Sequence, residues 1–327
     1  MHGNIVSLVD STGVPLNKSG ILGVVGSGGG GGGSEAIAGG GYATNGANGV
    51  PNADYYTYNV ATDTYTTITQ YSSNLYSQGG YGNSNDGTVF GGHVGSGSNT
   101  RTEHWNSISW GAGGPIIWTG GGQCQGGGTS GTDGLCLGSG QASYGLNTTY
   151  AYDGSWVSGQ SLTYYQRQSA QGGDKNGSGI SITGYGGNTG TGTGASQRAE
   201  ACTRGSYNGA WSSITNTTHK GHQGTWCSAG DSSDFNYVGG YDTATTTYLT
   251  LNTKWNGVSY SAETPITTAQ TYPNGCGGDD TDNIISFAGL NPSGAISDTS
   301  YYWNGISWIT IAVYPQDTYA GNGGFIQ

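Results

Sequence analysis

The stretch Trp303-Asn304-Gly305-Ile306-Ser307-Trp308 places two tryptophans on either side of an Asn-Gly pair. Its opening element, a large apolar residue followed by Asn or Asp, occurs seven times in the 327-residue chain, at intervals of 47 to 55 residues. A fixed period in this range indicates a repeat architecture, in which each repeat forms one supersecondary unit. The seven pairs are Val9-Asp10, Tyr58-Asn59, Trp105-Asn106, Tyr152-Asp153, Tyr207-Asn208, Trp255-Asn256 and Trp303-Asn304.

Each repeat has the composition of several short strands. Runs of Tyr, Thr, Val, Ile and Trp alternate with clusters of Gly, Asn and Ser, as in Thr88-Val89-Phe90 before Gly91-Gly92. Such runs are typical of strands. The Asn-Gly pairs that follow three of the aromatics predict hairpins with type I′ turns, which need positive φ at both central residues. We expect a second aromatic to face the first across each hairpin. These second aromatics are Tyr65, Trp110, Trp156, Trp211, Tyr260 and Trp308.

Four short strands in about 47 residues match one blade of a β-propeller. The apolar run ending in Gly-Gly, the aromatic-Asn pair and the later Trp resemble the kelch repeat family. A closer resemblance is to the "WNG.SW" repeats of marine bacterial and phage proteins, which residues 303–308 match fully and residues 105–110 match with one departure. The resemblance covers nearly the whole chain and implies an all-β propeller of four-stranded kelch-like blades. Function does not follow from it, because propellers host many unrelated activities.

The two ends of the chain predict how the ring closes. Residues 1–18 have the pattern of a closing hairpin, and Tyr319 to Gly324 have the pattern of the opening of another repeat. We therefore expect one propeller domain over residues 1–327, with seven blades, one of them shared by the two termini, and with 318–327 as the closing strand. The alternative is a six-bladed ring with residues 1–18 as an N-terminal hairpin or arm outside it.

Composition narrows the possible partners and compartments. The net charge of −11 opposes binding to nucleic acid and to anionic membranes, and no apolar run is long enough to span a membrane. Met1-His2-Gly3-Asn4 lacks the basic start of a secretory signal. Yet the abundant Tyr, Ser, Thr, Asn and Gly suit an extracellular surface. A virion protein, assembled in the host cytoplasm and released by lysis, reconciles these features; the alternative is an extracellular or cell-surface location.

The five cysteines are an odd number, so they cannot all pair within the chain. Cys124 and Cys136 flank a Gly-rich turn and can face each other across adjacent strands, which leaves their disulfide state open. Cys227 and Cys276 lie in the Gly-rich strands of neighbouring repeats. We interpret the cysteines as buried, reduced thiols that pack as small apolar residues. Zinc is not expected, because CxxC spacing is absent.

The sequence predicts no catalytic, cofactor or metal site, and we expect no cofactor. GxSxG, HExxH and P-loop motifs are absent. The pair His219 and His222 and the acidic run Asp279 to Asp282 are interpreted as solvated loops rather than metal sites. The sequence does not identify ligand-binding residues. Aromatic side chains can stack on sugar rings, so exposed tyrosines are candidates for sugar binding. The candidates for such stacking are the tyrosines outside the repeat register, Tyr71, Tyr76, Tyr164 and Tyr165.

The expected function is that of a non-enzymatic structural or adhesion component of a phage particle, such as a fibre, spike or decoration protein. Its neutral Gly/Tyr/Asn-rich loops would serve host attachment, in multiple copies with other particle or surface proteins and with cell-surface glycans as further partners. One alternative is a lectin-like carbohydrate-binding propeller on a bacterial surface. Another, implied by the kelch resemblance, is a galactose oxidase-like copper enzyme.

Overall fold

The computed structural model describes residues 35–41, 53–72, 74, 76–94, 97–117, 126–128, 130–141, 144–163, 165, 169–185, 195–202, 207–217, 222–223, 227–242, 245–273, 275–316 and 322–326. Within these ranges the regular secondary structure consists of β-strands. None of the described residues forms a helix long and apolar enough to cross a membrane. An all-β architecture therefore agrees with the prediction from the Tyr, Thr and Val runs.

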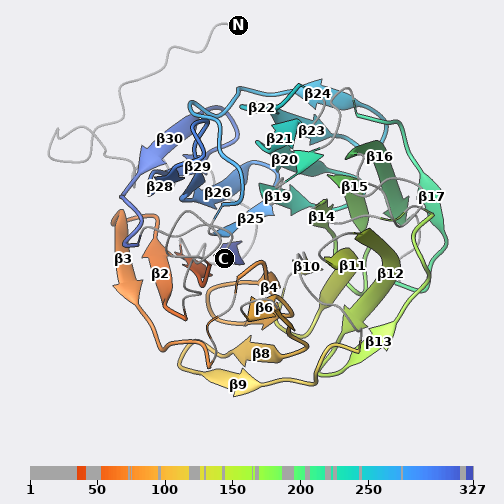
Figure 1. Cartoon of the computed structure of the whole chain (residues 1–327), viewed down its shortest axis with the longest axis horizontal. Helices are drawn as coiled ribbons and strands as arrows, with labels where there is room; N and C mark the ends of the chain where they lie inside the picture. Colours follow the sequence, from red (N-terminus) through yellow and green to blue (C-terminus); the bar gives the residue numbers. More distant parts are fainter. Residues whose placement is uncertain are drawn as a thin grey trace, which may run out of the picture.

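The strands form antiparallel four-stranded sheets that are arranged as blades around a central axis (Figure 1). In chain order, the first blade contains β1 (Glu35–Gly39), β2 (Tyr55–Asn59), β3 (Thr64–Thr67) and β31 (Asn322–Ile326). The second blade contains β4 (Gly79–Gly82), β5 (Gly87–Phe90), β8 (Thr102–Trp105) and β9 (Trp110–Ala112). The third blade contains β10 (Gly127–Gly128), β11 (Gly134–Gln141), β12 (Tyr144–Tyr152) and β13 (Trp156–Ser158). The fourth blade contains β14 (Ala170–Gly172), β15 (Ile180–Tyr185), β16 (Ala195–Cys202) and β17 (Trp211–Ser213). The fifth blade contains β19 (Cys227–Gly230), β20 (Phe235–Val238), β23 (Asn252–Trp255) and β24 (Tyr260–Ala262). The sixth blade contains β25 (Gly275–Asp280), β26 (Asn283–Phe287), β29 (Ser300–Trp303) and β30 (Trp308–Ile311). Small accessory sheets are formed by β6 (His93–Val94) with β7 (Gly97–Ser98), by β18 (His222–Gln223), β21 (Tyr241–Asp242) and β22 (Thr247–Tyr248), and by β27 (Gly289–Leu290) with β28 (Ile296–Ser297).

The first blade joins strands from opposite ends of the described chain. β31 lies near the centre of the ring and pairs antiparallel with β1, from Ala36 opposite Ile326 to Gly39 opposite Asn322 (Figure 1). The other five blades of the described chain each come from one continuous stretch. The prediction of seven blades is therefore wrong. Because the C-terminal strand completes the blade that starts at β1, its pairing needs no additional blade. The hairpin or arm predicted for residues 1–18 lies outside the described residues.

In five of the six described blades the two aromatics lie opposite each other across the outer hairpin, as predicted. The pair Tyr207 and Trp211 is the exception, because Trp211 lies opposite Cys202. Trp105 is opposite Trp110, Trp303 is opposite Trp308, and their ring centroids are 5.3 and 5.5 Å apart. Trp303 is 1% exposed. The residue at the hairpin tip points the other way, since Ile306 is 78% exposed. Ile108 and Val258 are equally exposed in their hairpins, so three of the described outer hairpins present an apolar side chain at the tip.

These hairpins do not use the predicted type I′ turn. Positive φ is found one residue after each Asn, at Ser107, Gly257 and Gly305. The side-chain oxygen of Asn304 accepts hydrogen bonds from the backbone N–H groups of Ile306 and Ser307, at 3.1 and 2.9 Å. This side chain closes a four-residue loop, whereas the prediction assumed a two-residue turn with both residues left-handed.

Indole hydrogen bonds of several tryptophans stabilise the blades and link neighbouring ones, although Trp211 Nε1 has no hydrogen-bond partner among the described residues. The first aromatic of a pair donates to a turn of its own blade, as Trp303 Nε1 does to the carbonyl of Thr281 at 3.2 Å. The second aromatic donates to the preceding blade, as Trp308 Nε1 does to the carbonyl of Thr264 at 3.1 Å. The same contact to the preceding blade is made by Trp110 with Thr69 O at 3.0 Å and by Trp156 with Thr102 Oγ1 at 2.8 Å.

The cysteines differ from the prediction in one respect. Cys227, on β19, is part of a disulfide bond, so the interpretation of every cysteine as a reduced thiol is wrong. β19 and β25, which carry Cys227 and Cys276, are the inner strands of adjacent blades, as the neighbouring repeats implied. Cys136 is fully buried and its Sγ donates to the carbonyl of Gly138 at 3.5 Å. Cys124 lies outside the described residues.

Reduction of the Cys227 disulfide should destabilise the ring, because a cross-link limits the freedom of the unfolded chain. We expect a loss of about 2–4 kcal/mol. The measurement is the melting temperature with and without a non-thiol reductant, and non-reducing peptide mapping identifies the bonded sulfur. In the control variant Cys227→Ser the reductant should have no further effect. Equal melting of reduced and untreated wild type would contradict the expectation.

Candidate functional site

A pocket of about 310 Å3 opens on the axis of the ring. It is formed where the inner strands β4, β10, β14, β19 and β25 turn toward the second strand of their blades. Much of its wall is the main chain of glycines, including Gly127 and Gly172. Besides Tyr81 and Ala229, the side chains at the wall are polar or acidic and come from different blades. They are Gln171, Asp174, Ser228, Asp231, Ser233, Asp234 and Thr281.

The glycines are needed because neighbouring blades approach closely at the axis. The Gly173 N–H donates to the carbonyl of Gly230 in the next blade at 2.8 Å. A Cβ at Gly127 would lie 2.6 Å from the carbonyl oxygen of Gly173, which is closer than real Cβ contacts allow. The Gly-rich inner strands therefore bring main-chain atoms together around the axis.

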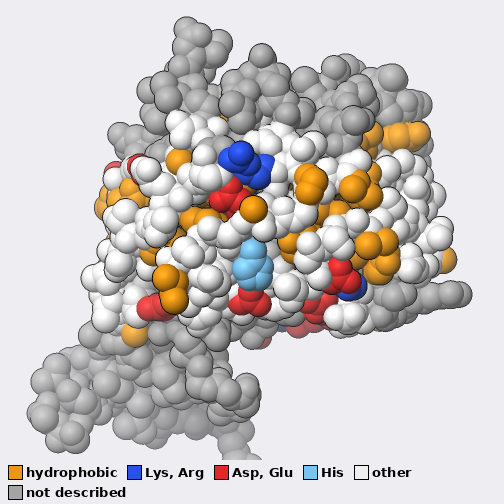
Figure 2. Space-filling view, turned by 90° about the horizontal axis from the view of Figure 1, so that it is seen from below, with side chains coloured by type: hydrophobic (Ala, Val, Ile, Leu, Met, Phe, Trp, Pro, Cys, Tyr) orange, Lys and Arg blue, Asp and Glu red, His pale blue; other side chains and the backbone are white. Residues whose placement is uncertain are grey.

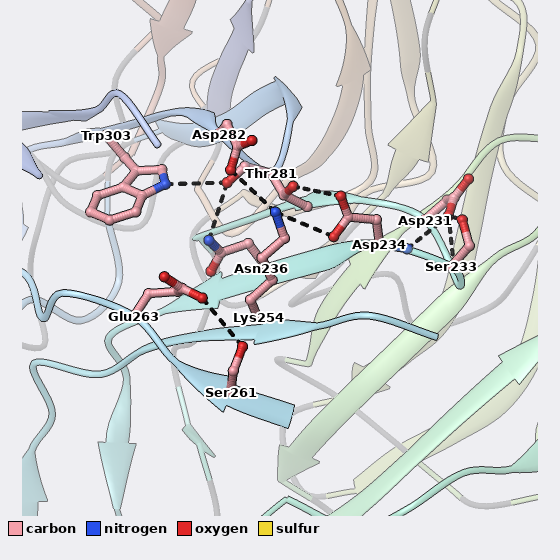
Figure 3. A network of polar contacts seen from close by, with 10 residues as sticks. All are labelled: Asp231, Ser233, Asp234, Asn236, Lys254, Ser261, Glu263, Thr281, Asp282 and Trp303. Carbon is pink, nitrogen blue, oxygen red and sulfur yellow. Dashed lines mark hydrogen bonds and ion pairs between the residues drawn. The ribbon is translucent and has the colours of Figure 1, made fainter. Parts of the chain in front are cut away.

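The acidic residues at the pocket come from turns that occupy equivalent places in successive blades. In the fifth blade, Asp231 accepts hydrogen bonds from the N–H and the hydroxyl of Ser233, at 2.7 and 2.6 Å. Asp234 accepts one from the hydroxyl of Thr281 in the sixth blade, at 2.9 Å (Figure 3). These bonds hold the carboxylates in place at the mouth of the pocket, where hydroxyl donors of a ligand can reach them.

One lysine lies beside this network. Lys254 Nζ is 3.5 Å from Asp234 and 3.2 Å from Asp282, and it joins the turns of the fifth and sixth blades (Figure 3). Burial lowers the pKa of Lys254, but the bonds to Asp282 and Asp234 outweigh burial, and the pKa is raised from its usual value. The ammonium group is therefore charged at neutral pH and balances part of the acidic mouth.

Asp174 is a carboxylate at the mouth of the pocket whose surroundings disfavour ionisation. Burial raises the pKa of Asp174, the Gly177 N–H lowers it, and the carboxylates of Asp133 and Asp231 raise it further, with a net shift upward. A raised pKa means that the folded state binds the proton more tightly than the unfolded state. The resulting cost to stability is present above the folded pKa and disappears as pH falls to the ordinary value of 3.8.

We therefore expect Asp174→Asn to raise the melting temperature at pH 7, by a free energy below about 1 kcal/mol because the site is partly exposed. The gain should shrink as pH falls toward 4. The measurement is thermal unfolding of both proteins between pH 4 and pH 8. Asp153→Asn is the opposite control, since hydrogen bonding to Lys175 lowers the pKa of Asp153. A gain that is independent of pH would contradict the expectation.

Of the described residues considered from the sequence for metal or sugar binding, Thr281 of the run Asp279 to Asp282 lines the pocket and the candidate tyrosines do not. Tyr71 is buried, and Tyr76 stacks on His93 with ring centroids 5.2 Å apart. In the run Asp279 to Asp282, Asp282 contacts Lys254. Across the described residues, no three His, Cys, Asp or Glu side chains are placed to hold a metal ion. His219 and Tyr164 lie outside the described residues.

Comparison with known proteins supports the architecture. No protein-family model and no curated protein matches this chain. Among solved structures, the one titled "Structure of YjhT" is similar, with a TM-score of 0.62 and 10% sequence identity, over 84% of this chain and 97% of that one. The chain is a β-propeller. At this identity the likeness concerns the fold, and activity has to be argued from the site itself.

Proposed function

We propose that this propeller is a non-catalytic adhesion module that binds neutral, hydroxyl-rich ligands such as glycans at its axial pocket. The observation that carries the proposal is the lining of that pocket. Carboxylates accept hydrogen bonds from sugar hydroxyls, Ser and Thr hydroxyls both donate and accept, and the glycine main chain donates through N–H and accepts through C=O. Among the described lining residues the charged ones are acidic, which disfavours anionic ligands. The rigid ring keeps these groups fixed, so binding requires little ordering.

The proposal includes where the module works. We infer that it is a structural component of a particle, as a phage fibre, spike or decoration protein, or of a bacterial surface, and that its blades are kelch-like repeats of the WNG.SW type. Two observations support a place outside the reducing cytoplasm. Cys227 is in a disulfide, a bond typical of oxidising environments. Charged residues are 8% of the chain. Weak single contacts at an acidic pocket become strong when many copies engage together.

The test compares glycan binding by monomeric protein and by protein displayed in many copies on beads. Multivalent display should bind neutral glycans that the monomer binds weakly. Ser233→Trp places a bulky ring at the mouth and should reduce binding at least about tenfold. Ser293→Trp is the matched control, because Ser293 lies in a similar turn away from the pocket, with its hydroxyl 2.6 Å from Asn291. Equal binding by the two variants, or turnover of a sugar or alcohol by the monomer, would contradict the proposal.

A further inference from the structure

A second hollow lies on the outer wall of the ring, away from the axial pocket. It has a volume of about 710 Å3 and is formed between Ser72, which follows β3 of the first blade, and the outer strands β8 and β9 of the second blade. Figure 2 views this side of the ring and shows a largely uncharged wall with scattered charged side chains. We call this hollow the outer groove. The residues that matter to its chemistry are Ser72, Arg101, Glu103 and Trp110.

A carboxylate lies at the base of the outer groove. The side chain of Glu103 is 6% exposed, and it accepts hydrogen bonds from the hydroxyl of Ser72 and from the Ser72 N–H, the latter at 3.4 Å. Arg101 Nη1 is 3.7 Å from the carboxylate, and the Arg101 side chain is 45% exposed. Burial raises the pKa of Glu103, while the Ser72 N–H and Arg101 lower it, with a net shift upward. Burying this carboxylate costs stability, because its interactions only partly replace water.

The blade fold does not require this pair. β8 (Thr102–Trp105) and β23 (Asn252–Trp255) occupy the same place in their blades, and each ends in the buried tryptophan of the hairpin. At the positions that match Arg101 and Glu103, the fifth blade has Leu251 and Thr253. Since both blades close in the same way, the outer hairpin does not depend on a charged pair at these positions.

Two buried tyrosines pack behind Trp110, which lines the groove. Tyr55 and Tyr71 are 0% and 2% exposed, and their hydroxyls make no hydrogen bond to other protein atoms. Burial raises the pKa of Tyr71, and the charge of Glu103 raises it further. Buried polar atoms without a hydrogen-bond partner carry a cost in stability.

An aromatic ring forms one wall of the groove. Trp110 is held from behind by edge contacts to Tyr55 and Tyr71, with centroids 4.9 and 5.4 Å away, and its Nε1 donates to the carbonyl of Thr69 at 3.0 Å. These contacts fix the ring while it still lines the groove. A fixed aromatic surface beside a carboxylate and a guanidinium suits a ligand with an apolar face and hydroxyls at its edge.

We propose that the outer groove is a second binding site for one neutral pyranose ring, which stacks on Trp110 and hydrogen-bonds through its hydroxyls to Glu103 and Arg101. The proposal deepens the proposed glycan-binding function and rests on it. The carboxylate accepts from sugar hydroxyls and the guanidinium donates to them. A neutral ligand is favoured because Arg101 and Glu103 offset each other in charge.

The experiment uses three probes on the full chain, the methyl glycosides of glucose, galactose and N-acetylglucosamine, measured by saturation-transfer NMR and calorimetric titration. The variant Arg101→Leu/Glu103→Thr installs the residues of the fifth blade, so it should fold. It should bind at least one probe about tenfold more weakly than wild type. The matched control Leu251→Met/Thr253→Ser should bind as wild type does.

The axial variant Ser233→Trp separates the two sites. Retention of probe binding in Ser233→Trp, with loss in Arg101→Leu/Glu103→Thr, supports the outer groove. Unchanged binding of every probe in Arg101→Leu/Glu103→Thr overturns it, as does absence of probe binding to wild type. In either of these two outcomes, wild-type protein displayed in many copies can still bind glycans. If it does, and Ser233→Trp abolishes that binding, the proposed function of the axial pocket stands and only the proposal of a second site in the outer groove is rejected.

Discussion

Replacing Trp303 by Ala should lower the free energy of unfolding by about 3–5 kcal/mol, as for other large aromatics in protein cores. Trp303 is 1% exposed and belongs to a cluster of buried side chains that joins the fifth and sixth blades. The substitution removes the contact with Trp308 and the hydrogen bond from Nε1 to the Thr281 carbonyl. Chemical denaturation of the two proteins measures the loss directly.

Two variants of the same hairpin make this prediction specific. Ile306→Ala removes a side chain that is 78% exposed, so it should change stability by less than about 0.5 kcal/mol. Trp303→Phe keeps an aromatic ring and loses the N–H, so its cost should fall between the other two. If Trp303→Ala unfolds at the same denaturant concentration as wild type, the described packing around Trp303 is incorrect.

Deleting residues 322–327 should open the ring. β31 occupies the inner place of the first blade, and β1 pairs with it on one edge and with β2 on the other. The deletion leaves the N–H and C=O groups on one edge of β1 unpaired, and about four ladder hydrogen bonds are lost. At roughly 0.5–1.5 kcal/mol each, the expected loss is about 2–6 kcal/mol. An exposed strand edge also favours aggregation.

The measurements are thermal unfolding and size-exclusion chromatography of the truncated chain. Adding a synthetic peptide of residues 318–327 in excess should restore part of the lost stability, because the peptide can pair with β1. A control peptide of the same composition in scrambled order should not. A truncated protein that is as stable and as monomeric as the full chain would show that β31 does not close the ring.

The propeller could be predicted from sequence because each aromatic-Asn pair marks a local hairpin, and Trp105 and Trp303 end equivalent strands as expected. The number of blades could not, because it depends on the pairing of Ala36 with Ile326, which are far apart in the sequence. Local spacing contains no information on that contact, and the pair Val9-Asp10 satisfied the repeat pattern without revealing it. The turn type was missed because the Asn304 side chain, rather than its backbone, closes the loop.

The axial pocket could not be found from the sequence, since main-chain atoms line much of it and its polar side chains, from Gln171 to Thr281, are dispersed over several blades. The outer groove did leave a signal. Aligning the repeats on Trp105 and Trp255 sets Arg101 and Glu103 against Leu251 and Thr253. A buried charge present in one repeat and replaced in another is a departure that the fold does not demand.

The indole bonds between blades give the ring a direction. Trp110, Trp156 and Trp308 each donate to the blade that precedes their own. Each of these bonds therefore stabilises the interface with the preceding blade and not the interface with the following one. Removing one of these indole rings should therefore loosen only one of the two interfaces of its blade, the one with the preceding blade. In Trp156→Phe, amide hydrogen exchange should accelerate at the border of the second and third blades while the border of the third and fourth stays protected. The propeller would then open at one interface between blades at a time, and the orientation of the tryptophans would decide which interface opens.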